Sequence, residues 1–474
     1  ARVSCHEFRG ASLLYEPEVV AVKSGFHGGH WGTLMPFLRA CLATGTPPRP
    51  VAAPASVTAP ARWPSSASVH ELGIAMMPRS RSSGAVIDWG QGIRQRWRAG
   101  EAAAIAAADD FVAAGMLKYE KDRSRADVET ATARVSAHLR LGELSPRYLY
   151  HAIHDSGQPA QVYKTFSRRL HWRDLAYFHL SVFPSMRREG IRRHYDQTRW
   201  VSPPEEATRR LKAWQRGQTG YPIVDAGMRE LYATGWMCQS VRMVVASFLI
   251  EYLRVNWVEG EKWFFDTLVD ADSAINAMMW QNAGRSGIDQ WNFVLSPENA
   301  SQDITGAYTR RWCPELSRLS NKWLHTPWKA PPHELAAAGV TLGVSYPHRI
   351  VADLAAERRL GVQAVLDMRR LNQEFNDPGG YDLISLPGGQ TTRVFTKQEF
   401  RLDAAGNVKP PPQYSASGSD QARGRAGRGR GGRQRRGGGA GGRGGSRSMT
   451  FTEQPTIKSY FARTTLDTGK AIDA

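Results

Sequence analysis

One arginine and two aspartates occur inside apolar segments, where a charged side chain is costly unless it is paired. Arg242 lies in the apolar run 237–257, and Asp270 and Asp272 lie in the segment LVDADSAINAMMW. A guanidinium buried without a partner costs several kcal/mol. We therefore expect Arg242 to pair with Asp270 or Asp272. Two interpretations stay open, a structural ion pair and a network that holds a polar ligand.

Buried helices must position these charges. The run 237–257 has few helix breakers, and its large apolar residues recur at helical spacing, which predicts a buried helix. These residues are Val244, Val245, Phe248, Leu249, Tyr252 and Leu253. A second strong helix former is GEAAAIAAADDFVAAGM (100–116). We predict a mainly α fold for the central part of the chain.

Composition narrows the classes of function. A chain of 474 residues is long enough for two domains with tails. Its 15 Trp and 15 Tyr suit a core that packs around a ring-shaped ligand, although a purely structural aromatic core is the alternative. The formal charge of +18 favours a polyanionic partner. No apolar run reaches membrane-spanning length, and we predict no membrane partner.

The four cysteines are scattered and show no CxxC spacing. They are Cys5, Cys41, Cys238 and Cys313. This usage predicts a reducing compartment and no metal site.

The first hundred residues carry weaker patterns. EFRGASLLYEPEVVAV (7–22) has a short strand-like pattern, and GTLMPFLRACLA (32–43) predicts a helix before the GTPPRP break. Residues 52–68 are rich in Pro, Ala and Ser, and we interpret 61–99 as a connector.

Several motifs follow one another in a fixed order: GYPIVDAGMRELYATGWM (220–237), VRM (241–243), NWVEGE (256–261) and LVDAD…N…MMWQ (268–281). Their order resembles the flavin-binding core of the DNA photolyase and cryptochrome family, and the resemblance runs from about Gly100 to about Arg349. It implies a helical FAD-binding domain, 100–375, preceded by an α/β domain. Residues 1–60 resemble only a remnant of that α/β domain, so an antenna chromophore (folate or deazaflavin) is not expected.

The resemblance also implies the residues that hold FAD. Read without it, the polar run 132–136 before a helix is typical of an ordinary N-cap and also suits a pyrophosphate. In the family this run and an upstream tyrosine hold the FAD phosphates, and Asn276 faces the flavin N5. An amide at that place can hydrogen-bond N5 but cannot deliver a proton. The predicted cofactor residues are Tyr119, Thr132, Ala133, Arg134, Val135, Ser136, Phe166, Arg173, Gln239, Arg242, Asp270, Ala271, Asp272 and Asn276.

Three tryptophans match the family's electron relay from the flavin to the surface. They are Trp280, Trp257 and Trp200. Core packing is the alternative for each of them.

The predicted substrate pocket departs from the family pattern. Arg169 stands where the best-known dimer photolyases have a Glu, Gln239 replaces an Asn, and Asn282 replaces a Trp. Trp172 and Met243 are retained. The pair of histidines typical of (6-4) photolyases is absent, since Gln239 and Met243 stand there. The lesion class therefore stays open.

Five arginines predict a track for DNA phosphates, with a solvated face as the alternative. The set is Arg168, Arg169, Arg192, Arg193 and Arg199.

The last hundred residues change character. Residues 376–421 are predicted to be an irregular extension, and 422–448 hold nine Arg and no acid, which predicts a disordered tail that binds RNA or single strands. Within 451–474, the motif 454–461 resembles the PIP box that docks on the sliding clamp PCNA. Its predicted contact residues are Gln454, Ile457, Tyr460 and Phe461.

Two hypotheses follow. The first is an FAD-dependent, light-driven lyase that repairs pyrimidine dimers in damaged duplex DNA, located in the nucleus with an organelle as the alternative. The second is a cryptochrome-type blue-light photoreceptor without repair activity. Asn276, the basic tail and the clamp motif favour the first, whereas Arg169, Gln239 and Asn282 favour the second.

Overall fold

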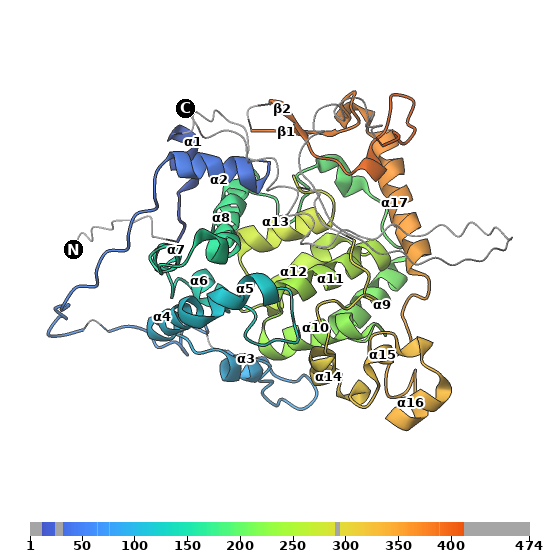
Figure 1. Cartoon of the computed structure of the whole chain (residues 1–474), viewed down its shortest axis with the longest axis horizontal. Helices are drawn as coiled ribbons and strands as arrows, with labels where there is room; N and C mark the ends of the chain where they lie inside the picture. The colour runs from blue at the N-terminus through green and yellow to red at the C-terminus, as the bar shows by residue number, and fades with distance from the viewer. Residues whose placement is uncertain are drawn as a thin grey trace, which may run out of the picture. The chain divides into compact units, whose positions relative to one another are not determined.

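The computed structural model describes residues 12–23, 32–63, 65–74, 76–289, 294–387 and 389–411, and these belong to one compact unit, 1–412. Helices dominate this unit, which confirms the predicted mainly α fold (Figure 1). The Arg/Gly tail 422–448 and the clamp-like motif 454–461 lie outside the described residues. No helix in the described ranges combines the length and the apolar character needed to cross a bilayer.

The first two helices pack against the long helix α8 (Ala160–Val182). α2 (Leu34–Ala43) confirms the helix expected there, whereas α1 (Pro17–Lys23) is a helix where a strand-like pattern was expected, so that prediction is wrong. The reason lies just before α1, where the Leu14 and Tyr15 amides bind a side chain. Both N–H groups donate to Asp174 of α8, at 3.2 and 2.9 Å, and no strand in the described chain pairs with them.

Five short helices, α3 to α7, lie between α2 and α8 in the chain. The predicted helix 100–116 is present, with a π-helical turn at Phe111–Gly115 between α4 and α5. The bounds are α3 (Gln91–Arg96), α4 (Glu101–Asp110), α5 (Met116–Asp122), α6 (Ser136–Leu141) and α7 (Pro146–His154).

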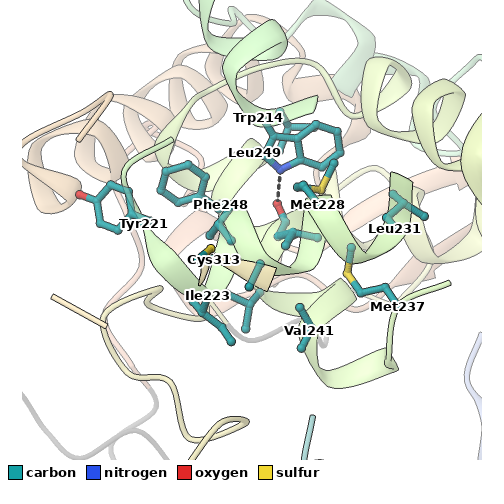
Figure 2. Close-up of a cluster of buried hydrophobic side chains, with 14 of the residues drawn as sticks. Trp214, Tyr221, Ile223, Met228, Leu231, Met237, Val241, Phe248, Leu249 and Cys313 are labelled. Atoms are coloured by element: carbon teal, nitrogen blue, oxygen red, sulfur yellow. Dashed lines mark hydrogen bonds between the residues drawn. The ribbon is translucent and has the colours of Figure 1, made fainter. Parts of the chain in front are cut away.

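The centre of the fold is a set of helices, α9 to α13, that pack around one large apolar core (Figure 2). Trp214 of α9 is fully buried there, and its indole N–H donates to the Val245 carbonyl at 3.0 Å. The predicted helix over 237–257 is present as α11 and a π-helical continuation, Phe248–Tyr252. The bounds are α9 (Pro204–Gln215), α10 (Pro222–Thr234), α11 (Gln239–Ser247), α12 (Trp257–Thr267) and α13 (Ser273–Ala283).

Helices α12 and α13 pack very closely because a glycine of each pair of contacts leaves room for an aromatic ring. Gly260 of α12 faces the Trp280 ring of α13, and Gly284, just after α13, faces the Trp257 ring of α12. A Cβ atom at Gly260 would lie 2.2 Å from the Trp280 ring, and one at Gly284 would lie 2.4 Å from the Trp257 ring. Side-chain caps fix where both helices begin: Asn256 accepts from the Val258 amide at 3.0 Å.

The chain then runs through short helices to α17 and a small hairpin. Strands β1 (Asp382–Ser385) and β2 (Thr391–Val394) pair antiparallel, within a segment predicted to be irregular. The helices are α14 (Ala307–Trp312), α15 (Asn321–Leu324), α16 (Pro332–Ala338) and α17 (Leu354–Leu371), with 3-10 turns at Arg193–Gln197, Pro314–Leu316, Pro327–Lys329, Gln373–Phe375 and Gln398–Phe400. We call residues 376–411 the C-terminal extension.

A buried aspartate ties the C-terminal extension to the helical body. Asp382 is ion-paired with Arg192 and Arg369, and it also accepts from His194 Nε2 at 3.1 Å and Tyr195 OH at 3.0 Å. Asp382, Arg192 and Arg369 are all fully buried. The placement of Arg192 in a DNA phosphate track is therefore wrong, because its guanidinium is enclosed by the C-terminal extension and the carbonyls of the loop after α13.

Candidate functional site

A cavity with about 800 Å³ of empty space, counting the part open to solvent, lies between α11 and α13. One wall follows a face of α11 and its π-helical continuation, and the other follows a face of α13 and the turn before it. The lining residues are Gln239, Arg242, Met243, Ala246, Ser247, Glu251, Phe264, Leu268, Asp270, Ala271, Asp272, Ile275, Asn276, Met279, Trp280, Ala283 and Lys397. Eight of the predicted site residues are thus brought together on one cavity.

The ion pair expected from the sequence is present in this wall. Arg242 Nη2 donates to both carboxylate oxygens of Asp270, at 3.1 and 2.9 Å, and Arg242 Nε donates to the Met237 carbonyl at 2.7 Å. Arg242 Nη1 has no hydrogen-bond partner among the described residues. The Arg242 side chain remains 19% exposed, so this wall offers a positive donor that is partly open to a ligand.

Asp272 fixes the direction of α13. Its Oδ1 accepts from the amides of Ala274 and Ile275, at 2.9 and 3.0 Å, as the N-cap of the helix. Its Oδ2 accepts from Tyr177 OH at 3.0 Å and lies 3.8 Å from Arg173 Nη2. Because side chains four residues apart share a helix face, this cap also sets how Asn276 and Trp280 enter the cavity.

Asn276 has a defined orientation because both of its amide hydrogens are used. Nδ2 donates to the Glu261 carbonyl at 3.1 Å and to the Glu261 carboxylate at 3.2 Å. Glu261 is buried and is paired with Arg187 Nε at 3.0 Å. The Asn276 carbonyl oxygen is left to accept a hydrogen bond from a ligand N–H, and the amide has no acidic proton to give.

The polar run Thr132–Ser136 leads into α6, a six-residue helix that begins at Ser136 and has Val135 as its N-cap. Arg134 has φ +51° and places its guanidinium 4.7 Å from the centre of the Trp236 ring. Its Nε is buried and has no hydrogen-bond partner in the described chain. Buried donors are nearly always satisfied, so this orphaned N–H marks a place where a bound acceptor fits.

A buried acid lies behind this run. Glu230 of α10 is 6% exposed and accepts from Tyr308 OH at 2.6 Å. Burial raises the pKa of Glu230 to about 7, against the opposing effects of the Tyr308 hydrogen bond and of the Arg134 and Arg242 charges.

The predicted cofactor residues on α5 and α8 do not line the cavity. Tyr119 and Phe166 are buried, with ring centroids 5.2 Å apart in an edge-to-face arrangement. Arg173 is buried too, and its Nη2 donates to the Leu139 carbonyl at 3.4 Å while it approaches Asp272. Arg173 therefore connects α6 to the start of α13.

The three relay tryptophans fall in or against the same apolar core. Trp280 lines the cavity, Trp257 is equally buried at 3% exposure, and Trp200 is half-buried against that core. The chain after Trp200 lies beside the segment before Trp257, since the Val201 amide donates to the Arg254 carbonyl at 2.8 Å. This arrangement is compatible with a relay, whose function remains a prediction.

Comparison with known proteins decides the family. Residues 166–365 match the model of the FAD binding domain of DNA photolyase. A deoxyribodipyrimidine photo-lyase from Agrobacterium fabrum is 38% identical over 361 residues, which cover 75% of this chain and 72% of the relative. The chain belongs to the DNA photolyase and cryptochrome family. Among solved structures, a bacterial class III photolyase from Agrobacterium tumefaciens matches with a TM-score of 0.68 at 37% identity, covering 76% of this chain and 72% of that chain.

Cryptochromes are also similar. Cryptochrome-1 from Arabidopsis thaliana is 36% identical over 281 residues, which are 56% of this chain and 40% of the relative. A Synechocystis cryptochrome structure matches with a TM-score of 0.52 at 28% identity, covering 56% of each chain. The chain thus spans about half the length of the cryptochromes that it matches.

The site of this photolyase-family member fits FAD. Arg242 Nη1 and Arg134 Nε are donors without partners in the described chain, and the Asn276 carbonyl is an open acceptor. An apolar wall of Met243, Met279 and Trp280 suits a flat ring. In the described ranges no group of His, Cys, Asp or Glu could hold a metal, and Cys41, Cys238 and Cys313 are buried free thiols.

The predicted substrate residues separate in the structure. Gln239 and Met243 line the cavity, and Trp172 is half-buried and packs, as Met279 does, against the apolar cluster that contains Ala277 and Met278. Arg169 is exposed on α8. Asn282 is not at the cavity: it is buried, and its Oδ1 accepts from the Asp289 amide at 3.3 Å.

Four residues of the site were missed from the sequence. Glu261 orients Asn276, Tyr177 binds Asp272, and Glu251 and Lys397 line the cavity. Glu251 had a usable signal, because an acid inside the apolar run 237–257 needs a partner just as Arg242 does. Lys397 had none, since it lies in a Gly/Pro-rich segment far along the chain.

Proposed function

We propose that this protein uses blue or near-UV light and FAD to repair pyrimidine dimers in DNA. The observation that carries the proposal is the cavity lined by the Arg242–Asp270 pair and by Asn276, in a chain 38% identical to a deoxyribodipyrimidine photo-lyase. Bound and reduced, FAD would supply the electron that light transfers to a dimer flipped out of the duplex. Flipping a damaged base costs only a few kcal/mol because its stacking is already poor.

The chain's own residues would bind and orient the two partners. Arg242 and the Asn276 carbonyl offer a donor and an acceptor to the polar edge of a flavin. Gln239 and Met243 offer an amide and an apolar contact on the same cavity. On α8, Arg168 is half-buried and Arg169 is exposed, and both would contact DNA phosphates.

The test is a repair assay. Reduced protein is illuminated with an oligonucleotide that carries one cyclobutane dimer or one (6-4) product, and restored bases are counted by chromatography. We expect restoration of one lesion class in the light and none in the dark. Failure with both lesions, in protein that carries FAD, would contradict the repair function.

A photoreceptor is the second candidate, favoured by the similarity to cryptochrome-1 and by the position of Asn282 away from the cavity. It predicts FAD binding and a light-induced change in protease sensitivity without repair. Both assays use the same illuminated sample. Restored bases support the repair function, and a change in protease sensitivity without restored bases supports the photoreceptor.

We also propose nuclear recruitment through the tail. Gln454, Ile457, Tyr460 and Phe461 would dock on PCNA, and the Arg/Gly segment 422–448 would add affinity for RNA or single strands through charge and stacking. Tyr460→Ala combined with Phe461→Ala should abolish capture of the protein on immobilised PCNA, while Thr464→Ala, outside the motif, should not. Equal capture of both variants would remove the clamp proposal.

A further inference from the structure

One arginine outside the cavity holds the group that orients Asn276. Arg187 follows α8 in the chain, and its Nε donates to Glu261 Oε1 of α12 at 3.0 Å. The same oxygen and the Glu261 carbonyl accept from the Asn276 amide, at 3.2 and 3.1 Å. Arg187 does not line the cavity, and its side chain is 35% exposed. These contacts therefore lead from a partly exposed arginine, through a buried acid, to the cavity wall.

The Arg187 guanidinium has a fixed place on α12. It lies 3.8 Å from the centre of the Phe265 ring, and Phe265 and Glu261 are one turn apart on the same face of this helix. The backbone before Arg187 is held as well, because the fully buried Gln281 donates from Nε2 to the Met186 carbonyl at 2.8 Å. Arg187 is thus placed by the fold so that it can hold Glu261 in one position.

The partners of the Asn276 amide allow it only one orientation. A backbone carbonyl and a carboxylate accept hydrogen bonds and cannot donate them. Turning the amide by 180° would bring its oxygen against both acceptors and leave buried polar groups unpaired, which costs about 1–3 kcal/mol. A buried carboxylate needs a cation beside it, and in the described ranges the ion-pair partner of Glu261 is Arg187.

We propose that Arg187 is a positioning residue that acts through Glu261 to fix the Asn276 amide, so that its carbonyl oxygen is kept for the group bound in the cavity. The cavity then favours a ligand that offers an N–H to this oxygen over one that offers a lone pair. The inference rests on the proposed function, in which the ligand is FAD. The flavin N5 accepts a hydrogen bond when oxidised and donates one when reduced, so the contact favours the reduced cofactor.

The test compares the affinities of the full chain for oxidised and reduced FAD. Arg187→Met keeps an apolar stem over Phe265 and removes the charge, so Glu261 can shift and the Asn276 amide can turn. We expect the ratio of reduced to oxidised affinity to fall about three- to tenfold, which corresponds to one hydrogen bond. The flavin midpoint potential, measured against a reference dye, should become more negative. Arg187→Lys should keep both values near those of the wild type.

A second background separates positioning from a direct effect of charge. Asn276→Leu removes the amide, so adding Arg187→Met to it should change neither value further. A direct charge effect would persist in that background. Arg188→Met is the matched control in the wild-type background, since Arg188 is the next residue and is exposed. It removes the same charge and should leave both values unchanged.

If Arg187→Met does not fold, Glu261→Gln takes its place in the same titration. A neutral amide there can donate as well as accept, so it no longer dictates how Asn276 is turned, and the same fall is expected. An unchanged ratio and potential, or an equal change in the Asn276→Leu background, overturns the inference alone. Wild-type protein that binds no FAD overturns the proposed function and this inference with it.

Discussion

Two Asp–Arg sites in this molecule use the same chemistry in opposite ways. Asp382, Arg192 and Arg369 are fully buried, and the carboxylate also accepts from Tyr195 and His194, so little of it remains for a ligand. In the Asp270–Arg242 pair, the arginine side chain is 19% exposed at the wall of a cavity. The difference indicates that a closed network stabilises the fold, whereas an open one is available for binding.

The largest expected effect is at the closed site. Asp382→Asn would leave two buried guanidiniums without their counter-charge and should lower the free energy of unfolding by about 3–5 kcal/mol. The two arginines hold the pKa of Asp382 well below its usual range, although burial alone would raise it. This contribution is complete above the ordinary Asp pKa of about 3.9 and is lost as pH falls toward the folded-state value.

Urea denaturation of wild type and variant from about pH 2 to 7 measures both effects, because the pH-dependent loss falls below about pH 4. Asp367→Asn is the control, because Asp367 pairs with Arg370 at 2.9 Å on the surface, where such pairs contribute little. A loss at Asp382 no larger than that at Asp367 would show that burial does not set the value of these pairs.

Glu230 is expected to give an intermediate effect with the opposite pH dependence. Its pKa of about 7 lies above that of an unfolded Glu, so the folded state binds the extra proton and stability falls as pH rises from about 4.5 to 7. Glu230→Gln keeps an acceptor for Tyr308 and removes the charge. The variant should gain up to about 3 kcal/mol at pH 8 and nothing at pH 4.5, measured by thermal unfolding.

A gain in stability of Glu230→Gln that is equal at both pH values would show that the effect comes from packing and not from the charge. Glu259→Gln is the control, since Glu259 is half-exposed and pairs with Lys262 at 2.9 Å.

The smallest effect on stability, and the largest on binding, is expected at the open pair. Asp270→Asn should change the free energy of unfolding by less than about 1 kcal/mol, because Arg242 can still be solvated from the cavity. It should weaken FAD binding about 10- to 100-fold, since the guanidinium is no longer held in place. Fluorescence titration with FAD measures the affinity, and urea denaturation measures the stability.

An Asp270→Asn variant that unfolds as easily as Asp382→Asn would erase the distinction between the two sites. Unchanged FAD affinity in a stable variant would instead place the flavin away from this wall of the cavity.

Local patterns predicted the helices and the pair at the cavity. The helix over 32–43 and the buried helix after Met237 are present because the spacing of their apolar residues places them on one face only in a helix. Arg242 pairs with Asp270 because a buried cation needs an anion. The strand-like pattern at 7–22 failed over Pro17–Lys23, which is a helix, and just before it the Leu14 and Tyr15 amides bind Asp174 in a distant helix.

Contacts between remote segments were not predictable. Arg192 was assigned to a DNA-facing surface because nothing near it in the sequence shows that Asp382 encloses it. Asn282 was assigned to the substrate pocket by its position in a motif, yet its side chain accepts a hydrogen bond from the Asp289 amide in the loop after α13. In both cases the partner is supplied by the fold and not by the motif.

The stretch that matches the family model stops at residue 365, before Asp382 is reached. A fragment cut there would contain Arg192 without its partner Asp382. It would also expose Met186 and Met278, which pack in one apolar cluster with residues of β1 and β2. We therefore expect a protein trimmed to that stretch to be poorly soluble, whereas a cut after residue 411 would keep Asp382 and the β1–β2 hairpin.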